Sequence, residues 1–135
     1  MLYVKTKLKE SPINGIGCFA DEDIPKGTLI WKFTKGYDQE FNSNILEKLH
    51  DPDANFWEQQ PSKQQFLKYA YISRATGHYI LCSDDARFFN HSDDNNVFNV
   101  IDENEQEGID YAARNIKAGE ELTYDYNVFA DFHKF

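Results

Sequence analysis

The sequence reads RFFNHS over residues 87–92 and GEELTYDY over residues 119–126, and the fold that we expect is inferred first from these two stretches. Asn90 and His91, with the serine that follows them, place hydrogen-bond donors and acceptors on a short piece of backbone. Tyr124 and Tyr126 are two residues apart, so both phenols share one face if the segment is a regular strand. Two such phenols can flank a slot for an aliphatic chain and hydrogen-bond an amine at its end. Each stretch alone is explained at least as well by a structural role, as a core histidine or a cross-strand aromatic patch.

A third stretch, near the start of the chain, reads NGIGCFA over residues 14–20. Gly15, Ile16 and Gly17 form a Gly-x-Gly sequence, which can let the backbone approach a ligand and offer its N–H groups to a carboxylate. The third glycine and the strand-then-helix context of a dinucleotide site are missing. Alone, the glycine pair is more typical of a turn than of a binding site.

Outside these stretches, the sequence predicts short strands separated by turns. Residues with high β-propensity predict strands over residues 2–7, 16–20, 28–33, 69–74, 78–82, 97–101, 109–114 and 121–126. Helical spacing is present over residues 43–49, with Ser43 as the cap, and Pro61 and Ser62 can open a second helix. The acidic stretch 102–107 predicts a solvated loop. This pattern predicts one α+β domain, mainly β, that spans residues 1–135 and contains one or two short helices.

Composition and charge narrow the class of protein. With 41% hydrophobic and 16% aromatic residues, the chain of 135 residues is not disordered and is long enough for one core. Its formal net charge of −9 repels nucleic-acid phosphates and attracts basic partners, although an acidic surface also simply keeps a protein soluble. Cys18 and Cys82 are too few for a four-thiolate zinc site or a disulfide framework. Because no signal peptide or membrane-spanning apolar run is present, we expect a cytoplasmic protein that binds neither nucleic acid nor membrane.

Taken in this order, the three stretches resemble the SET-domain protein lysine methyltransferases. The family pattern has Gly-x-Gly, then Arg-Phe-x-Asn-His-Ser-Cys-x-Pro-Asn, then Gly-Glu-Glu-Leu-Thr-x-Asp-Tyr, and the resemblance spans nearly the whole chain. The compact length and the sequence WKF at residues 31–33 are similar to the small stand-alone SET proteins of bacteria. The resemblance implies a SET fold of small curled sheets, in which the Asn90 and Tyr126 segments cross in a knot-like arrangement.

The same resemblance implies an S-adenosylmethionine-dependent protein lysine N-methyltransferase that acts on a basic protein and needs no metal. The residues expected to contact the cofactor are Gly15, Ile16, Gly17, Tyr71, Asn90, His91 and Tyr126. Tyr126 matches the essential tyrosine of the family, and Tyr124 stands where the family has Phe or Tyr, so these two are the expected catalytic residues. A hydroxyl at Tyr124 can hold a water in the space that a methylated amine needs. We therefore expect mainly mono- and dimethyl-lysine as products.

The sequence also departs from the family pattern. Asp93 and Asn95 replace its cysteine and proline, and no cysteine-rich tail follows Tyr126, so neither a pre-SET nor a zinc-binding post-SET region is expected. The lysine channel would be formed by Phe33, Tyr37, Tyr124, Phe129 and Phe132, with Phe135 completing an apolar lid. Phe33 lacks the hydroxyl that many relatives carry there, and Tyr37 is the candidate to replace it. A loose tail with exposed rings explains the last three phenylalanines equally well.

Two other functions stay open from the sequence. A non-catalytic SET-like module that binds basic peptides fits Phe33 and the missing tail. A calcium or magnesium site is less well supported, because its candidate ligands lack the glycine and closing glutamate of an EF-hand: Asp84, Asp85, His91, Asp93 and Asp94. A homodimer could complete the substrate groove. Glu120 and Glu121 are expected to be solvated, and Arg87 to form a structural ion pair.

Overall fold

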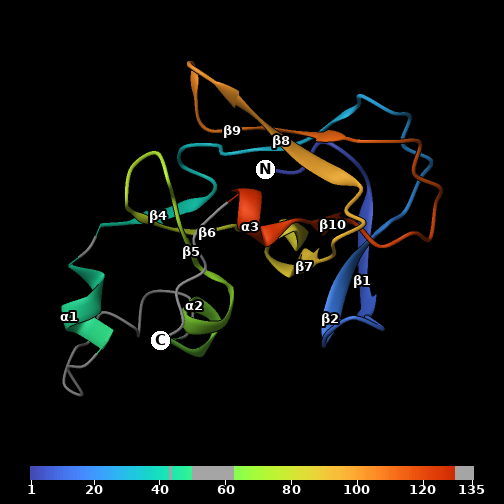
Figure 1. Ribbon diagram of the computed structural model, residues 1–135. Coiled ribbons are helices and arrows are strands. Elements are labelled where there is room, and N and C mark those ends of the chain that lie inside the picture. Colours follow the sequence, from blue (N-terminus) through green and yellow to red (C-terminus); the bar gives the residue numbers. More distant parts are fainter. Residues whose placement is uncertain (43, 50–62, 130–135) are drawn as a thin grey trace.

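The structure, a computed structural model, describes residues 1–42, 44–49 and 63–129. Over these residues the chain forms four small sheets of two or three strands, together with short helices (Figure 1). The expected α+β, mainly β architecture of small sheets is therefore confirmed. No helix in this part of the chain combines the length and the apolar character that crossing a bilayer requires.

An N-terminal hairpin carries the Gly-x-Gly sequence. β1 (Thr6–Glu10) and β2 (Ile16–Ala20) pair antiparallel, and β2 has the bounds that the sequence predicts. The strand expected from residue 2 begins later, and Leu2 instead makes an isolated bridge with Trp31. Gly15 lies in the turn with a φ of 49°, in the left-handed region that glycine adopts without strain.

A three-stranded antiparallel sheet, in the order β3-β9-β8, forms one side of the fold (Figure 1). Its strands are β3 (Leu29–Lys32), β8 (Val97–Asp102) and β9 (Glu105–Ala112). The solvated loop expected over residues 102–107 is wrong, because β8 and β9 are joined by a turn of only two residues. Within this stretch Glu107 is buried on β9, where the hydroxyls of Tyr71 and Ser73 donate hydrogen bonds to its carboxylate.

A second three-stranded sheet has the order β4-β6-β5 and is accompanied by two helices. The elements are β4 (Gln39–Phe41), β5 (Tyr71–Ile72), β6 (Tyr79–Leu81), α1 (Ile45–Leu49) and α2 (Lys63–Tyr69). The two helices predicted from the sequence are confirmed, while the predicted capping residues Ser43, Pro61 and Ser62 lie outside the described residues. Phe66 of α2 is fully buried and meets the Phe41 ring edge-on at 5.2 Å between centroids.

The Asn90 and Tyr124 segments lie side by side as a short parallel pair. The elements here are η2 (Asp85–Phe88), β7 (Asn90–His91), β10 (Thr123–Tyr124) and α3 (Tyr126–Phe129). The strand expected over residues 121–126 is wrong at its end, because Tyr126 already begins a helix. The Asp125 carboxylate accepts from the Asn127 N–H at 3.0 Å and so caps that helix. Tyr124 and Tyr126 therefore do not share one strand face.

Two apolar clusters hold these elements together. The larger one joins the hairpin, the β3-β9-β8 sheet and β10, and its fully buried side chains include Ile24, Trp31 and Leu122. The smaller one lies around Phe66, between the helices and the β4-β6-β5 sheet. The parallel pair belongs to the larger cluster through Tyr124.

Candidate functional site

One pocket collects the three stretches that the sequence analysis singled out. The predicted site residues in its wall are Gly15, Ile16, Tyr71, Asn90, Tyr124 and Tyr126. They come from the turn before β2 and the first residue of β2, from β5, from the parallel pair and from the start of α3. Apolar rings complete the wall, among them Trp31, Phe88 and Phe89. Residues separated by more than one hundred positions thus meet around a single cavity.

Asn96 fastens β10 beside β7. Its side-chain amide donates to the Glu121 carbonyl at 2.8 Å, and its Oδ1 accepts from the Thr123 N–H at 2.9 Å. The Ser92 N–H donates to the Tyr124 carbonyl at 2.8 Å and extends the pairing. Since Asn96 is buried with both polar ends satisfied, it fixes where Tyr124 enters the pocket wall.

Glu121 joins the hairpin turn to Asn90, a role that the sequence analysis missed. Its carboxylate accepts from the Asn90 side chain at 2.8 Å and from the Ser11 hydroxyl at 2.7 Å. The Asn90 side-chain amide also donates to the Asn14 carbonyl at 3.1 Å. A Cβ on Gly17 would lie 2.6 Å from Glu121 Oε2, so the second glycine of the motif makes room for this carboxylate and is not part of the pocket wall. The expectation that Glu121 is a solvated residue is therefore wrong.

Tyr126 is held at both its ends. Its hydroxyl donates to the Phe89 carbonyl, and its backbone N–H donates to His91 Nδ1 at 3.1 Å. Because Nδ1 accepts, the neutral ring carries its proton on Nε2, which lies 3.1 Å from an Asp93 carboxylate oxygen. Burial raises the pKa of Tyr126 to about 12, so the phenol is neutral at physiological pH. His91 lies beside the Tyr126 ring and outside the pocket wall.

Two buried carboxylates stand next to the pocket tyrosines, and the sequence analysis missed both. Asp110 accepts from the Tyr124 hydroxyl, and Glu107 accepts from the Tyr71 hydroxyl at 3.0 Å. Burial raises the pKa of Tyr71 and of Tyr124 well above the usual value of a phenol, so both keep their protons. Burial also raises the pKa of Asp110 to about 7, against the hydrogen bonds that lower it. Their partners come from distant elements, so local sequence patterns give no signal for either acid.

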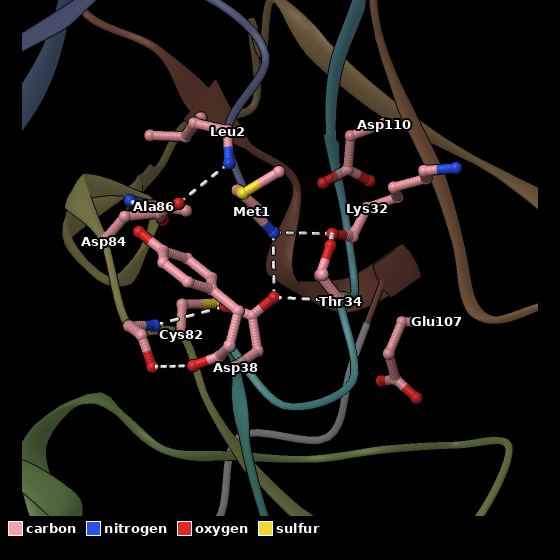
Figure 2. Close-up of polar contacts among 12 residues, drawn as sticks. Met1, Leu2, Lys32, Thr34, Asp38, Cys82, Asp84, Ala86, Glu107 and Asp110 are labelled. Carbon is pink, nitrogen blue, oxygen red and sulfur yellow. Dashed lines mark hydrogen bonds and ion pairs between the residues drawn. The ribbon is translucent and has the colours of Figure 1, made fainter.

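Phe33 and Tyr37 do not reach the pocket wall. Phe33 packs against the larger apolar cluster, and the Tyr37 side chain is exposed. Figure 2 shows how the following loop is fastened: the buried Asp38 carboxylate accepts from the Met1 ammonium at 2.8 Å and from the Thr34 N–H at 2.9 Å. Phe129 ends α3 with its side chain outside the described residues, as are Phe132 and Phe135. The predicted apolar lid therefore stays a prediction.

The candidate cation ligands do not converge. Asp84 accepts from the backbone N–H groups of Leu2 and Ala86, and Asp85 accepts from the Thr6 hydroxyl. The side chains of Asp93 and Asp94 are almost fully exposed. In the described part of the chain, no group of three or more histidine, cysteine or acidic side chains is arranged to hold a metal ion. Arg87 makes no ion pair among those residues and donates instead to the Cys82 carbonyl and to Gln65.

Comparison with known protein families matches residues 15–127 to the SET domain. A curated relative is the histone-lysine N-methyltransferase, H3 lysine-36 specific, of Debaryomyces hansenii. It is 30% identical over 131 residues, which cover 93% of this chain and 16% of that protein. The chain therefore spans only a small part of the length of the curated relative that it matches.

Solved structures share the fold at lower identity. A candidate histone methyltransferase of Plasmodium falciparum is 20% identical with a TM-score of 0.56, covering 93% of this chain and 95% of that chain. The polycomb repressive complex 2 of Chaetomium thermophilum is 22% identical with a TM-score of 0.62, covering 91% of this chain and 15% of that chain. A further structure of that complex, bound to S-adenosylmethionine, has a TM-score of 0.64 at 22% identity, covering 94% of this chain and 16% of that chain.

Proposed function

This chain belongs to the SET-domain family, and on that premise we propose that it is a protein-lysine N-methyltransferase that uses S-adenosylmethionine as methyl donor. The observation that carries the proposal is the convergence of Gly15, Asn90 and Tyr126 on one pocket. The names of the relatives support it, because one is a histone-lysine N-methyltransferase and a structure with a similar fold has S-adenosylmethionine bound.

The pocket suits an occupant that brings hydrogen-bond acceptors. Trp31 lies in its wall, and its indole Nε1 is a buried donor without a hydrogen-bond partner in the part of the chain that the structure describes. Buried donors are almost always paired, so this N–H favours a ligand with an acceptor nearby. S-adenosylmethionine carries a carboxylate, ribose hydroxyls and an adenine ring, which are acceptors of the required kind.

Asn90 offers a ligand a hydrogen-bond acceptor, whereas Trp31 offers a donor. Both of its amide hydrogens are donated, to the Asn14 carbonyl and to Glu121, so its Oδ1 can meet a ligand only as an acceptor. An ammonium group, such as the one on the methionine part of the donor, is a suitable partner. We propose that Asn90 holds this ammonium and that the backbone at Gly15 and Ile16 lies against the same part of the donor.

The bound donor would supply an electrophilic methyl group on a sulfonium. The attacking lysine must be neutral, and with a free pKa of about 10.4 its deprotonation at pH 8 costs roughly 3 kcal/mol. An apolar pocket lowers that cost because burial disfavours the ammonium form. Tyr126 stays a neutral phenol and its proton is donated to the Phe89 carbonyl, so it orients the reacting groups and does not act as a base.

The substrate that we propose is a lysine of a basic protein, methylated mainly to the mono- and dimethyl forms. The formal net charge of −9 attracts a basic partner, and the curated relative is named for a histone H3 lysine. Tyr124, whose ring lines the pocket and carries a hydroxyl that phenylalanine would lack, supports the limited degree of methylation that we propose. Recombinant histone H3 is therefore the first substrate to test.

The test compares Tyr126→Phe with the unmodified chain. Each protein is incubated with S-adenosylmethionine and histone H3, and mass spectrometry counts methyl groups on each lysine. We expect kcat to fall about 100-fold in Tyr126→Phe, the size typical of misplacing reacting groups. Tyr111→Phe is the matched control, since Tyr111 loses the same hydroxyl on β9 while its ring packs against Phe98 outside the pocket.

Two results would contradict the proposal. Full turnover by Tyr126→Phe would show that the pocket is not the site of the reaction. An unmodified chain that binds no S-adenosylmethionine in calorimetric titration, yet binds an H3 peptide, would favour the non-catalytic peptide-binding module.

A further inference from the structure

Asp110 is a buried acid whose hydrogen-bond partner lines the pocket. It lies on β9 with 0% of its surface exposed, and Tyr124 donates its hydroxyl proton to Asp110 Oδ2. The Asn99 side chain donates to Oδ1 at 2.8 Å. Both carboxylate oxygens therefore act as acceptors, and the acid stands next to the pocket wall without being part of it.

This contact decides how Tyr124 can meet a ligand. A phenol has one proton, so once that proton is donated to Asp110 the oxygen can bind a further group only as an acceptor. A neutral lysine amine, or its monomethyl form, still has an N–H to donate to such an oxygen. Neutral dimethyl-lysine has none. An oxygen held as an acceptor would therefore distinguish amines by the number of methyl groups that they already carry.

We propose that Asp110 is a positioning residue that keeps the Tyr124 oxygen an acceptor and so favours lysine amines that retain an N–H. The inference rests on the proposed function and deepens it. Tyr71 repeats the arrangement in the same wall, because its hydroxyl donates to Glu107, which also accepts from the Ser73 hydroxyl at 2.7 Å. Two phenols of the pocket are therefore each hydrogen-bonded to a buried carboxylate.

Asp110→Asn reverses the polarity of this contact with almost no change of shape. The Asn99 amide donates to Asp110 Oδ1 and to the Glu107 carbonyl, both at 2.8 Å, so its orientation is fixed. The oxygen of the new carboxamide is then held by Asn99, and its NH2 group is directed at Tyr124. The phenol must accept from that group, and its own proton turns to the ligand.

The measurement is the ratio of the methylation rates of two peptides. Both surround the lysine mapped on histone H3, one with the lysine unmodified and one with it dimethylated. We expect Asp110→Asn to lower this ratio about tenfold, the effect of one lost hydrogen bond to a charged or reacting group. Tyr124→Phe should lower it similarly, and the double variant no further, because both changes remove the same acceptor. Glu105→Gln is the matched control on β9, since Glu105 forms a partly buried ion pair with Lys32 and does not line the pocket.

The pH provides a second readout that a purely structural role would not change. The titratable or charged groups around Asp110 are Tyr71, Cys82, Glu107, Tyr124 and the Met1 ammonium. Burial raises the pKa of the two tyrosines and of the cysteine well above their usual values, so these stay neutral between pH 6 and 9. The pKa of Asp110 is about 7, so at pH 6 its carboxyl is protonated and can donate to Tyr124. The rate ratio of the unmodified chain should therefore decrease as the pH is lowered from 9 to 6.

The outcomes separate this inference from the function on which it rests. An unmodified chain that neither binds S-adenosylmethionine nor transfers a methyl group to histone H3 overturns both. An active chain whose rate ratio is the same in Asp110→Asn overturns the inference alone. If Asp110→Asn does not fold, the unmodified chain decides: a rate ratio equal at pH 6 and pH 9 contradicts the role of Asp110.

Discussion

At the scale of single residues, the site combines a buried donor that still needs an acceptor with a hydroxyl whose oxygen can only accept a further hydrogen bond. The Trp31 indole N–H is without a partner among the described residues, while the proton of Tyr126 is already committed to the Phe89 carbonyl. Trp31 and Tyr126 both line the pocket, so we expect its ligand to bring an acceptor to Trp31 and a donor to Tyr126. The role of Trp31 can be tested separately from catalysis.

Trp31→Phe should weaken the binding of S-adenosylhomocysteine about fivefold in calorimetric titration, because one hydrogen bond to the ligand is lost. In the unmodified chain, the indole N–H signal that this variant removes from the NMR spectrum should shift when the ligand is added. The variant also loses packing in the core, so its free energy of unfolding is measured in parallel by denaturant titration. An unchanged Kd, with an indole signal that does not move, would show that the N–H has no ligand.

At the scale of elements, local chemistry and distant contacts explain different parts of the structure. Strand β2 was predicted with its observed bounds, because its β-forming residues follow a clear turn. The start of α3 was not predicted, although Asp125 two residues before Asn127 is a capping signal that the sequence does contain. The acidic composition of residues 102–107 predicts a loop because carboxylates favour solvent. Glu107 is nevertheless buried, and the hydroxyls of residues 71 and 73 donate hydrogen bonds to its carboxylate. No window of sequence short enough to show a pattern includes both partners.

The residues of the candidate site also divide into those that local sequence motifs predict and those that only the folded structure reveals. Gly15, Asn90 and Tyr126 could be named from their motifs, and all three are in the pocket wall. Phe33 and Tyr37 were assigned to the channel by resemblance, and the structure places both outside that wall. Glu121 and Asp110 act through contacts with residues on other elements, so only the assembled fold reveals them.

The contact between Gly17 of the hairpin and Glu121, which precedes β10, can be tested by mutation. Gly17→Ala would place a Cβ 2.6 Å from Glu121 Oε2 and push the carboxylate away from Asn90 and Ser11. We expect a loss of about 2 kcal/mol in the free energy of unfolding, typical of overpacking, together with weaker cofactor binding. Denaturant titration and calorimetry measure the two effects.

A double-mutant cycle provides the control. In a Glu121→Ala background the obstructing carboxylate is gone, so Gly17→Ala should add little further loss. If Gly17→Ala lowers the free energy of unfolding equally in both backgrounds, the glycine is needed for a reason other than leaving space for the Glu121 carboxylate.

At the scale of the whole molecule, four small sheets bring together parts of the chain that no single sheet contains. The hairpin, the β7–β10 pair and the start of α3 each contribute to one pocket, and the larger apolar cluster holds them in place. We propose that this pocket is where S-adenosylmethionine binds.

A crystal structure with S-adenosylhomocysteine would test this binding site. We expect the ligand in this pocket, with its ammonium at Asn90 Oδ1, an acceptor at Trp31 Nε1 and the backbone of Gly15 against it. A ligand bound elsewhere on the chain, or a pocket still empty at saturating ligand concentration, would show that this pocket is not the binding site.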